Sequence, residues 1–465
     1  MEEKYDVIIV GAGPTGIFTA IELVRKAGKK SQEILIIEKG RALDNRQCLM
    51  KNNGRHPENS CQHCSSCSVV SGWGGAGAYS DGKLSLSPQI GGNLEQYIGN
   101  ERLEKNIEYV DEIYREFGAP DRIFGIDEEK KREMKEKAAL ASLEFIPARL
   151  RHLGTGYTRQ VLEKMKDYLL EKEVEIKFNT NVIDIVTEAG KISGLKTESG
   201  DVYGADRVVI APGRENSEWL MKLARELGIS LAINPVDIGV RVETSAIIAR
   251  GLTEGIYESK LIYRAPTFDD KVRTFCMSPY GEVVNENNHG LVTVNGHSHA
   301  DRKTVNTNFA LLVSKTFTEP FREPITYGKD IAKLANLLGG GVLIQRLGDL
   351  MDGRRSTPER IKRSIVEPTL KEATPGDLSL VLPYRHLKSL QEMLEALDDI
   401  APGIYSRDTL LYGVEVKFYS SQLEVDSNLE TGVDNLFVGG DGAGITRGLM
   451  QASISGVVIA RAILE

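Results

Sequence analysis

The sequence predicts an α/β fold in which one discontinuous domain, built on a parallel sheet, is interrupted by a second, α+β domain. Three observations lead to this expectation. A strand–turn–helix–strand pattern occupies the first 38 residues, short alternating strands follow over 174–213, and a strand, a glycine-rich turn and a long helix close the chain from residue 435. The intervening residues 236–415 differ in character, with several prolines among mixed strands and helices.

The N-terminal elements follow from hydrophobic patterning. Residues 5–10 (YDVIIV) and 33–38 (EILIIE) form short apolar runs, which predict buried parallel strands. Residues 14–28 carry apolar side chains at helical spacing and predict the helix between those strands. Residues 41–93 are polar, rich in glycine and cysteine, and lack a clear period. A loop of this length inside a compact domain is usually functional.

Helices are expected further along the chain. Two strongly charged segments, 100–118 and 127–145, predict solvated helices, and the amphipathic segment 157–172 predicts a third. Within the second domain we expect helices near 329–338 and 386–398. We see no internal repeat and no low-complexity tract.

Composition excludes several classes of protein. The chain has 465 residues, a formal net charge of −8 and a pI of about 5.6, which argues against nucleic acid as a partner. The N-terminal apolar run ends in glycine and predicts a strand rather than a signal peptide. No apolar segment reaches the roughly 20 residues of a membrane span. Five cysteines do not make a secreted disulfide framework, so we expect a cytoplasmic protein.

The first predicted turn carries a dinucleotide-binding signature. Gly11, Gly13 and Gly16 form a G-x-G-x-x-G motif between a strand and a helix, and Glu38 ends the next strand. Gly11 permits the tight turn, Gly13 admits the pyrophosphate, and Gly16 lets the helix pack on the sheet. The acid at Glu38 favours a free ribose 2′-hydroxyl, which indicates FAD or NAD rather than NADP.

Two distant segments favour FAD. The strand and turn "DRVVIAPG" (206–213) and the C-terminal "NLFVGGDGAG" (435–444) resemble those of FAD proteins of the glutathione-reductase type, and the resemblance implies that Asp441 contacts the ribityl or pyrophosphate region. No second G-x-G-x-x-G motif follows a strand, so NAD(P)H, if used, would visit the flavin only transiently. The glycines of "GWGGAGAYSDG" would let that backbone approach the cofactor.

These motifs predict the domain organisation and the cofactor contacts. We expect an FAD-binding, Rossmann-type domain formed by 1–90, 151–235 and 416–465, a helical insertion at 91–150, and a substrate domain at 236–415. The predicted FAD contacts are Gly11, Gly13, Pro14, Thr15, Gly16, Glu38, Lys39, Gly74, Gly75, Ala76, Gly77, Val182, Ala211, Gly213, Gly440, Asp441, Gly444 and Ile445.

Longer stretches resemble a known family. "GWGGAGAYSDGKL", "DIGVRVE", "TFCMSPYGEVV", "TVNGHSHADR", "NTNFALLV", "LLYGVEVKFYS" and "NLFVGGDGAGITRG" are similar to the bacterial and archaeal uncharacterised FAD-dependent dehydrogenases. The topology also resembles flavoproteins that reduce carbon–carbon double bonds, such as geranylgeranyl reductases. The resemblance covers nearly the whole chain and implies an FAD-dependent dehydrogenase or reductase.

Polar residues in these stretches are candidates for substrate chemistry. Arg447 follows the flavin motif and could hold an anionic substrate or stabilise reduced flavin. His297 and His299 alternate along a predicted strand and could protonate a substrate carbanion. Each of the three could equally be structural. Arg241 and Glu243 are expected to form a buried ion pair. Weaker candidates are Cys276, Tyr412, Glu415 and Lys417.

Four of the five cysteines lie in one segment. Cys61, Cys64 and Cys67 have C-x-x-C-x-x-C spacing, and Cys48 lies upstream. Thiolates at this spacing could hold a [4Fe–4S] cluster or a structural zinc ion. A redox disulfide, or free cysteines in a loop, are the alternatives.

The sequence therefore predicts an FAD-dependent oxidoreductase that transfers hydride between flavin and an organic substrate, for which an anionic unsaturated compound is one candidate class. One alternative is a flavin protein with an iron–sulfur cluster or dithiol that passes electrons to a carrier protein. Another is a non-redox flavoprotein of the tRNA-modification type, which the acidic pI disfavours.

Overall fold

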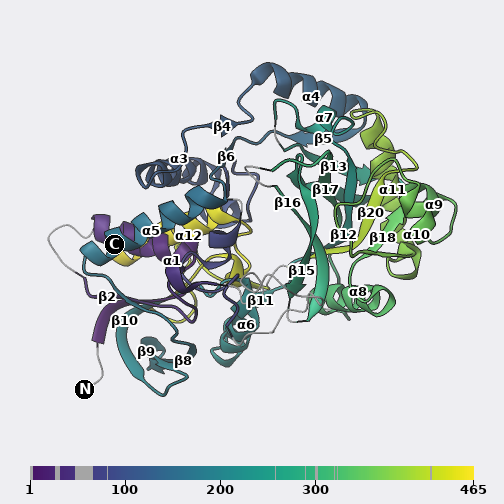
Figure 1. Ribbon diagram of the computed structural model, residues 1–465. Helices are drawn as coiled ribbons and strands as arrows, with labels where there is room; N and C mark the ends of the chain where they lie inside the picture. Colours follow the sequence, from purple (N-terminus) through teal and green to yellow (C-terminus); the bar gives the residue numbers. More distant parts are fainter. Residues whose placement is uncertain are drawn as a thin grey trace. The chain divides into compact units, whose positions relative to one another are not determined.

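The computed structural model describes residues 4–26, 32–47, 66–80, 82–256, 258–288, 290–298, 302–318, 320–321, 323–418 and 421–465. The chain divides into two compact units (Figure 1). Unit 1 comprises Met1–Arg122, Leu150–Asn234 and Tyr419–Glu465, and unit 2 comprises Ile123–Arg149 and Pro235–Phe418.

Unit 1 is built on a sheet whose central strands are parallel. The order is β7-β2-β1-β10, with β22 parallel to the last three residues of β10, while β9 and β8 continue from the first residues of β10 as an antiparallel meander. Apolar, buried residues fill β2 and the last four positions of β1, as expected for strands covered on both faces. The strands are β1 (Lys4–Val10), β2 (Ile34–Ile37), β7 (Glu175–Lys177), β8 (Val182–Glu188), β9 (Lys191–Thr197), β10 (Val202–Ile210) and β22 (Leu436–Val438).

Two helices from opposite ends of the chain lie against each other in unit 1. α1 (Pro14–Lys26) packs along α12 (Leu449–Leu464), as Figure 1 shows. The crossing is close because a Cβ on Gly456 would lie 2.2 Å from the carbonyl oxygen of Thr15. The remaining elements of unit 1 are η1 (Leu43–Asn45), η2 (Gly75–Tyr79), β3 (Lys83–Ser85), α2 (Glu95–Ile98), α3 (Asn100–Glu116), β6 (Leu150–His152), α5 (Thr155–Glu171), η3 (Arg214–Asn216), α6 (Ser217–Glu226), β11 (Leu231–Ala232), β21 (Gln422–Leu423) and η5 (Asp441–Ala443).

Unit 2 contains a larger sheet with the order β19-β18-β20-β12-β17-β14-β13-β5. All its pairs are antiparallel except β18 with β19, and β15 and β16 form a separate hairpin. The strands are β5 (Leu143–Ile146), β12 (Val236–Ser245), β13 (Lys260–Ala265), β14 (Asp270–Ser278), β15 (Glu282–Asn288), β16 (Leu291–His297), β17 (Asn306–Lys315), β18 (Leu343–Arg346), β19 (Thr374–Pro375) and β20 (Leu410–Lys417).

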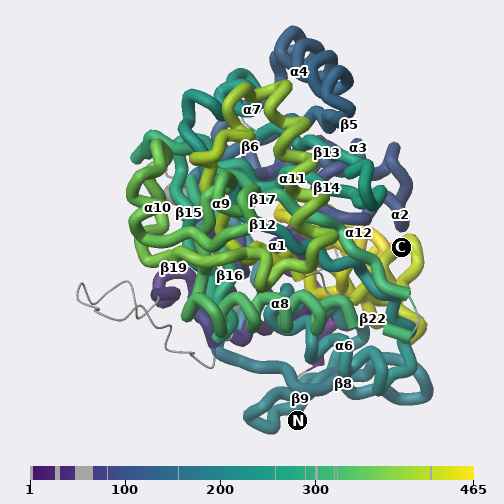
Figure 2. Tube along the Cα trace, turned by 90° about the vertical axis from the view of Figure 1, so that its right-hand side faces the viewer, coloured from purple at the N-terminus to yellow at the C-terminus, as the bar shows by residue number. Residues whose placement is uncertain are grey.

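The two faces of this sheet differ chemically. Alternate residues of β12 (Val236, Ile238, Val240 and Val242) share one apolar core with α8 (Pro324–Gly339) and α11 (Tyr384–Asp398). Figure 2 shows both helices lying over the sheet. Asp237, Arg241 and Glu243 alternate with these residues and lie on the opposite face, the face next to the β15–β16 hairpin. This second face holds a buried polar layer, described below.

One predicted helix is shorter than expected. The charged segment 127–145 forms α4 (Glu128–Leu140), but Ser142 has φ +57°, and the next four residues form β5 beside β13. The sequence LEFI alternates there between buried residues (Leu143 and Phe145) and more exposed ones (Glu144 and Ile146), which fits a strand rather than a helix. The other elements of unit 2 are β4 (Ile123–Phe124), α7 (Arg250–Thr253), α9 (Leu347–Met351), α10 (Pro358–Lys362) and η4 (Leu378–Leu380).

The expected α/β architecture is confirmed. Within the described part of the chain, no helix is both long and apolar enough to cross a bilayer.

Candidate cofactor-binding site

The G-x-G-x-x-G turn joins β1 to α1, and each glycine has a distinct environment. Gly11 has φ +104°, and a Cβ there would lie 2.2 Å from the carbonyl oxygen of Ala211. A Cβ on Gly16 would lie 2.0 Å from the carbonyl oxygen of Gly11. By contrast, a Cβ on Gly13 would meet no atom within 4 Å. Gly11 and Gly16 therefore permit close packing, whereas Gly13 leaves open space at the N-terminus of α1, where the helix dipole favours an anion.

Glu38 connects three segments around this turn. Its buried carboxylate accepts hydrogen bonds from the backbone amides of Ala12 (2.8 Å), Gly40 (2.8 Å) and Gly72 (2.9 Å). An ionised carboxylate has about four acceptor positions, so one remains on Oε2, the oxygen bonded to Ala12. A ribose hydroxyl could occupy that position.

The glycine-rich turn of residues 72–79 lies directly against the first turn. The amide of Gly74 donates to the carbonyl of Ala12 at 2.7 Å, and a Cβ on Gly75 would lie 3.2 Å from Cα of Gly13. Ala76 belongs to η2, and a Cβ on Gly77 would lie 2.7 Å from a methyl of Leu449. The predicted residues of this turn therefore border the open space at Gly13.

Sequence reasoning missed Arg46, which holds this turn. The guanidinium is buried and donates to the carbonyls of four residues, while stacking on the ring of Tyr79 at 5.0 Å. Burial lowers the pKa of Arg46. The hydrogen-bond acceptors of Arg46 are main-chain carbonyls, so no pattern of side chains in the sequence could predict them. The four carbonyls belong to Ser68, Val69, Trp73 and Gly75.

The C-terminal glycine-rich motif closes another side of the same region. The amide of Gly439 donates to the carbonyl of Ile210 at 3.2 Å, and a Cβ on Gly442 would lie 2.5 Å from the carbonyl oxygen of Gly213. Asp441 accepts the hydroxyl of Thr446 at 2.6 Å, which fixes its carboxylate. These contacts bring the segments 206–213 and 435–444 together.

Residues that follow this motif are held by residues 88–94. The carbonyl of Ile445 accepts the amide of Asn93 at 2.9 Å, and the amide of Arg447 donates to the carbonyl of Gly91 at 2.7 Å. The carbonyl of Gly444, which has φ +72°, accepts the side-chain amide of Asn234 at 3.2 Å. Arg447 therefore lies, half-buried, between η5 and α12, two residues before that helix begins.

The remaining predicted contacts have varied surroundings. Pro14 is the first residue of α1, where proline suits a helix. The hydroxyl of Thr15 donates to the carbonyl of Ala452 in α12 at 2.9 Å. The carbonyl of Gly213 lies beside Gly442, and a Cβ on Gly213 itself would meet no atom within 4 Å. Val182 is a buried residue at the start of β8.

Lys39 and Gly440 are also engaged with other residues. Lys39 forms an ion pair with Glu215 at 3.1 Å and donates to the side chain of Asn216 at 2.8 Å. A Cβ on Gly440 would lie 2.6 Å from the hydroxyl oxygen of Thr15, so this glycine permits close packing.

Together these segments have the features that a dinucleotide requires. Gly13 and Gly213 leave open space, α1 points its N-terminus there, and Glu38 retains one acceptor position. The backbone, rather than a set of charged side chains, forms most of this region. The geometry fits a ligand that combines ribose hydroxyls with an anionic phosphate group.

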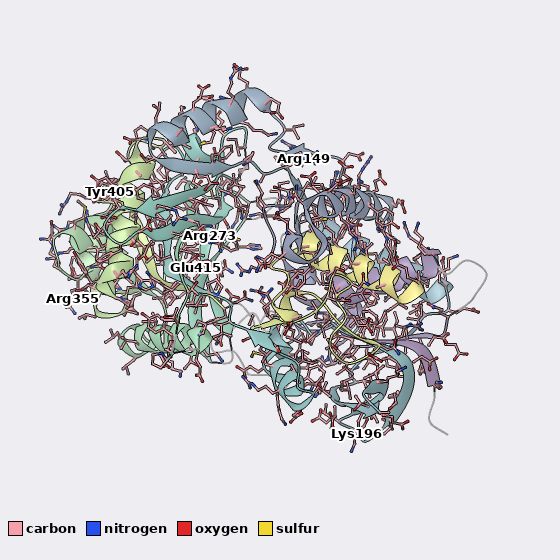
Figure 3. The ribbon with its side chains drawn as sticks, turned by 180° about the vertical axis from the view of Figure 1, so that it is seen from behind. Arg149, Lys196, Arg273, Arg355, Tyr405 and Glu415 are labelled. Carbon is pink, nitrogen blue, oxygen red and sulfur yellow. The ribbon has the colours of Figure 1, made fainter. Side chains whose placement is uncertain are left out.

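Unit 2 contains a separate buried polar layer. Arg241 and Glu415 are both fully buried, and Nη1 of Arg241 lies 3.5 Å from the carboxylate. Lys417 lies 3.0 Å from the same carboxylate. Burial disfavours the charged form of Lys417, but the carboxylates of Glu415 and Glu286 outweigh this effect and raise its pKa. Figure 3 shows Glu415 within the sheet.

The expected ion pair between Arg241 and Glu243 is wrong. Arg241 pairs across strands with Glu415, whereas Glu243 accepts hydrogen bonds from Tyr412 (2.5 Å), Asn306 (3.0 Å) and the hydroxyl of Thr369 (2.6 Å). Residues on neighbouring strands lie closer together than residues two apart on one strand, which explains the difference. Burial, followed by the charge of Glu243, raises the pKa of Tyr412 well above its ordinary value.

The histidine candidates are only partly described. His297 is the last residue of β16, lies opposite Glu282 in the hairpin register, and is half-buried. His299 lies outside the described residues. Cys276 has φ +49° at an irregularity of β14, and its carbonyl accepts Nη2 of Arg241 at 2.6 Å.

Comparison with known proteins identifies the family. Residues 6–238 match the family model of the FAD binding domain, which spans half of the chain, and residues 250–418 match that of the FAD-dependent protein, C-terminal domain-like. The chain belongs to the FAD binding domain family. It is an FAD-dependent oxidoreductase.

The similar proteins that cover the whole of this chain share little sequence identity with it. An uncharacterised protein of Clostridium beijerinckii is 26% identical over 492 residues, which cover 100% of this chain and 81% of that protein. Among solved structures, 3-ketosteroid-Δ4-(5α)-dehydrogenase of Rhodococcus jostii RHA1 has a TM-score of 0.46 and 14% identity, covering 100% of this chain and 97% of the other. L-proline dehydrogenase of P. horikoshii has a TM-score of 0.43 and 14% identity, covering 100% and 94%.

The cysteine segment of this FAD-dependent oxidoreductase is mostly outside the described residues, which exclude Cys48, Cys61 and Cys64. Cys67 is described as a half-buried free thiol whose carbonyl accepts the amide of Ser71 at 2.9 Å. Within the described residues, no three His, Cys, Asp or Glu side chains converge on a metal position.

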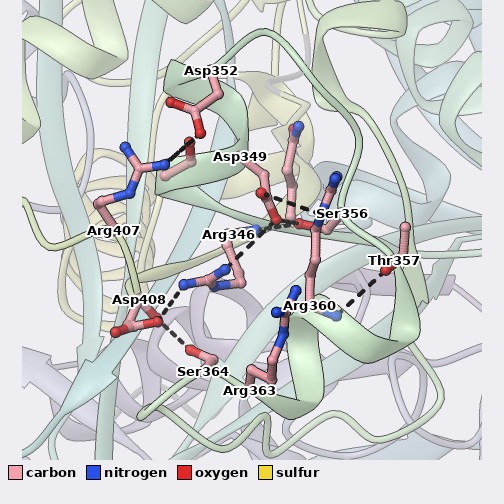
Figure 4. A network of polar contacts seen from close by, with 12 residues as sticks. Arg346, Asp349, Asp352, Ser356, Thr357, Arg360, Arg363, Ser364, Arg407 and Asp408 are labelled. Carbon is pink, nitrogen blue, oxygen red and sulfur yellow. Dashed lines mark hydrogen bonds and ion pairs between the residues drawn. The ribbon is translucent and has the colours of Figure 1, made fainter.

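A second polar network in unit 2 lies outside the expected sites (Figure 4). The fully buried carboxylate of Asp349 accepts from Nε of Arg354 at 3.0 Å and from the hydroxyl of Ser356 at 2.8 Å. Arg346 pairs with Asp408 at 2.5 Å. These contacts join β18, α9 and the segments that precede α10 and β20. Arg360 of α10 also lies 3.9 Å from Asp349, so Arg346, Arg354 and Arg360 form structural ion pairs.

Proposed function

We propose that this FAD-dependent oxidoreductase binds FAD at the glycine turns of unit 1 and transfers hydride between the flavin and an organic, anionic unsaturated substrate. The open position at Gly13 carries the first half of this proposal, because it lies at the N-terminus of α1 and is bordered by the 72–79 turn. Glu38 supports it with one unused acceptor for a ribose hydroxyl.

The chain's own residues would bind and orient the cofactor. The backbone at residues 11–16 and 72–77 would receive the diphosphate, Glu38 the adenosine ribose, and Asp441, fixed by Thr446, a hydroxyl of the ribityl chain. FAD supplies the two-electron chemistry when bound, while the protein supplies binding, orientation and electrostatics.

Substrate handling is assigned to charged and titratable side chains. We propose that Arg447 holds the anionic group of the substrate and that His297 or His299 moves a proton to or from a substrate carbon. Arg447 supports this role by its place between η5 and α12, directly after the C-terminal glycine motif. Residues 236–415 are proposed as the substrate domain.

The test is a single-turnover experiment on the FAD-loaded protein. Under anaerobic conditions, chemically reduced protein is mixed with a panel of α,β-unsaturated carboxylates, and the visible absorbance of oxidised flavin is followed. The proposal predicts reoxidation by at least one compound of the panel. Arg447→Ala should raise the substrate concentration that gives half of the maximal reoxidation rate, and Arg447→Lys should restore part of the affinity. Failure of every anionic enoate to reoxidise the flavin would reject this substrate class while leaving FAD binding untouched.

The roles of the four cysteines and of an electron carrier stay proposals. We propose that Cys48, Cys61, Cys64 and Cys67 form a metal or dithiol centre, supported by their spacing. Iron and zinc determined on anaerobically purified protein test this directly. Stoichiometric iron or zinc that is lost on Cys64→Ser would support a metal site, and metal-free protein whose thiol titration does not change on oxidation would reject both forms of the centre.

A further inference from the structure

Unit 1 contains two buried arginines with contrasting partners. Arg151 is 2% exposed and donates through Nε and Nη2 to both oxygens of Asp111, each at 2.7 Å. Arg46 is equally buried, at 2% exposure, but donates to main-chain carbonyls. Within the described part of the chain, no carboxylate lies within 4 Å of the Arg46 guanidinium. A buried cation without an ion-pair partner is unfavourable unless another negative group balances it.

Other cations in this region already have carboxylate partners. Lys39 lies 3.1 Å from Glu215, and Arg214 lies 3.8 Å from Asp441. Glu38 attracts Arg46 at longer range, but all three of its own hydrogen bonds are to backbone amides. The positive charge of Arg46 therefore has no contacting counter-charge among the described side chains.

The position of Arg46 points to the missing negative group. Its Nη1 donates to the carbonyl of Gly75 at 2.8 Å, and a Cβ built on Gly75 would lie 3.2 Å from Cα of Gly13. Gly13 in turn borders the open space at the N-terminus of α1. The backbone of two residues, Gly75 and Gly13, thus separates the guanidinium from the position at which a phosphate group would be bound.

We propose that Arg46 supplies the fixed positive charge of a diphosphate subsite, so that the chain selects ligands carrying a diphosphate over the corresponding uncharged nucleoside. The inference rests on the proposed placement of FAD at the glycine turns. The field of Arg46 acts through the backbone of the 72–75 turn, whose residues 72–74 are buried, and charge–charge attraction across buried protein is stronger than in solvent. The same fork of hydrogen bonds holds the turn against Ala12 and Gly13.

The test uses the full-length protein stripped of flavin, with ADP and adenosine as probes in isothermal titration calorimetry. Arg46→Lys keeps the charge and Arg46→Gln removes it, while both variants lose part of the fork of hydrogen bonds to the carbonyls. We expect Arg46→Gln to weaken ADP binding about 30-fold and to leave adenosine binding nearly unchanged, whereas Arg46→Lys retains most of the ADP affinity. Arg151→Lys and Arg151→Gln are the matched controls, which should lower thermal stability without changing either affinity.

Equal ADP affinities for Arg46→Gln and the wild type, or equal losses in the Lys and Gln variants, would overturn the assignment of charge to Arg46. If both variants fail to fold, the wild type decides, because equal affinity for ADP and adenosine would contradict a diphosphate subsite. Gly13→Val separates this inference from the placement of the cofactor. If Gly13→Val binds ADP as the wild type does, the placement is wrong. If Gly13→Val abolishes binding and Arg46→Gln does not weaken it, the role of Arg46 alone is wrong.

Discussion

The carboxylate of Glu38 accepts the backbone amide of Gly72, 34 residues further along the chain, at 2.9 Å. This bond and the bond from Ala12 tie the end of β2 to both glycine turns of the proposed FAD site. Glu38 is thus part of the framework of the site as well as a candidate ribose ligand.

Glu38→Gln should therefore destabilise the protein as well as weaken FAD binding. An amide nitrogen in place of one oxygen would face a backbone donor, and the loss is expected to be about 2 kcal/mol in the free energy of unfolding. Urea unfolding of flavin-free protein measures this loss. Glu33→Gln, at an exposed position before the same strand, is the control and should change nothing. Unchanged stability of Glu38→Gln would mean that the three amides find other acceptors.

Gly456→Ala sets helix propensity against packing. Alanine in the middle of α12 gains about 1 kcal/mol of intrinsic helix propensity over glycine. Its Cβ would, however, lie 2.2 Å from the carbonyl oxygen of Thr15, and backbone cannot rotate away as a side chain can. We expect a net loss of roughly 1–3 kcal/mol and a lower Tm. In Gly328→Ala the nearest atoms belong to side chains, two valine methyls and a ring carbon of Phe418, at 3.0 Å and beyond, so this control should be nearly neutral. A stabilised Gly456→Ala would refute the close crossing of α1 and α12.

Removal of Glu415 should harm unit 2 more than removal of Lys417. Glu415 balances both Arg241 and Lys417, so Glu415→Gln leaves Arg241 buried without a carboxylate partner and leaves Lys417 only Glu286, at 3.8 Å. Breaking a buried pair in this way costs about 3–5 kcal/mol. Lys417→Met leaves the contact between Arg241 and Glu415 in place and should be milder. Chemical denaturation of the two variants gives the order, and a milder effect of Glu415→Gln would contradict it.

His386 should make stability fall in mild acid. Burial, aided by the charge of Lys315, lowers its pKa from 6.5 to about 4, and neither ring nitrogen has a hydrogen-bond partner among the described residues. Below pH 6.5 the unfolded chain binds a proton that the folded chain does not, so stability decreases as pH falls from 6.5 towards 4, by roughly 3 kcal/mol at most.

Unfolding of wild type and His386→Leu across this pH range measures the effect. The stability of the wild type relative to His386→Leu should fall by up to roughly 3 kcal/mol as pH falls from 6.5 towards 4. Asp270 does not confuse the comparison. Burial opposes its ionisation, but hydrogen bonds from Arg385 and Lys315 outweigh this and lower its pKa to about 2, so its contribution is lost only as pH falls below about 3.8. A constant difference between the two proteins would show that His386 is not held neutral.

Local patterns predicted the parts of the fold that depend on neighbouring residues. The strand before Gly11, the helix from Pro14 and the acid at Glu38 follow from spacing alone, because the β1–α1–β2 unit is continuous in sequence. The end of the helix in segment 127–145 was predicted too late. The segment is strongly charged, and its sequence does not indicate where α4 ends and β5 begins.

Contacts between distant strands could not be predicted in the same way. Arg241 pairs with Glu415 because β12 and β20 are neighbours in the sheet, and one sequence gives no register between them. The role of Arg46 was also hidden, because its acceptors are carbonyl groups that every residue possesses. The sequence therefore indicated the glycines of the proposed site but not the side chain that holds their second turn.

The most direct test of the FAD site is the flavin content of two matched glycine variants. Gly13 and Gly432 both have open space around the position of a Cβ and lack a positive φ, so valine should be accommodated by the fold at either position. The purified proteins are compared by visible absorbance and by FAD released per chain. The account predicts that Gly432→Val binds FAD as the wild type does and that Gly13→Val, while folded, loses it. Full FAD content in Gly13→Val would contradict the proposed site.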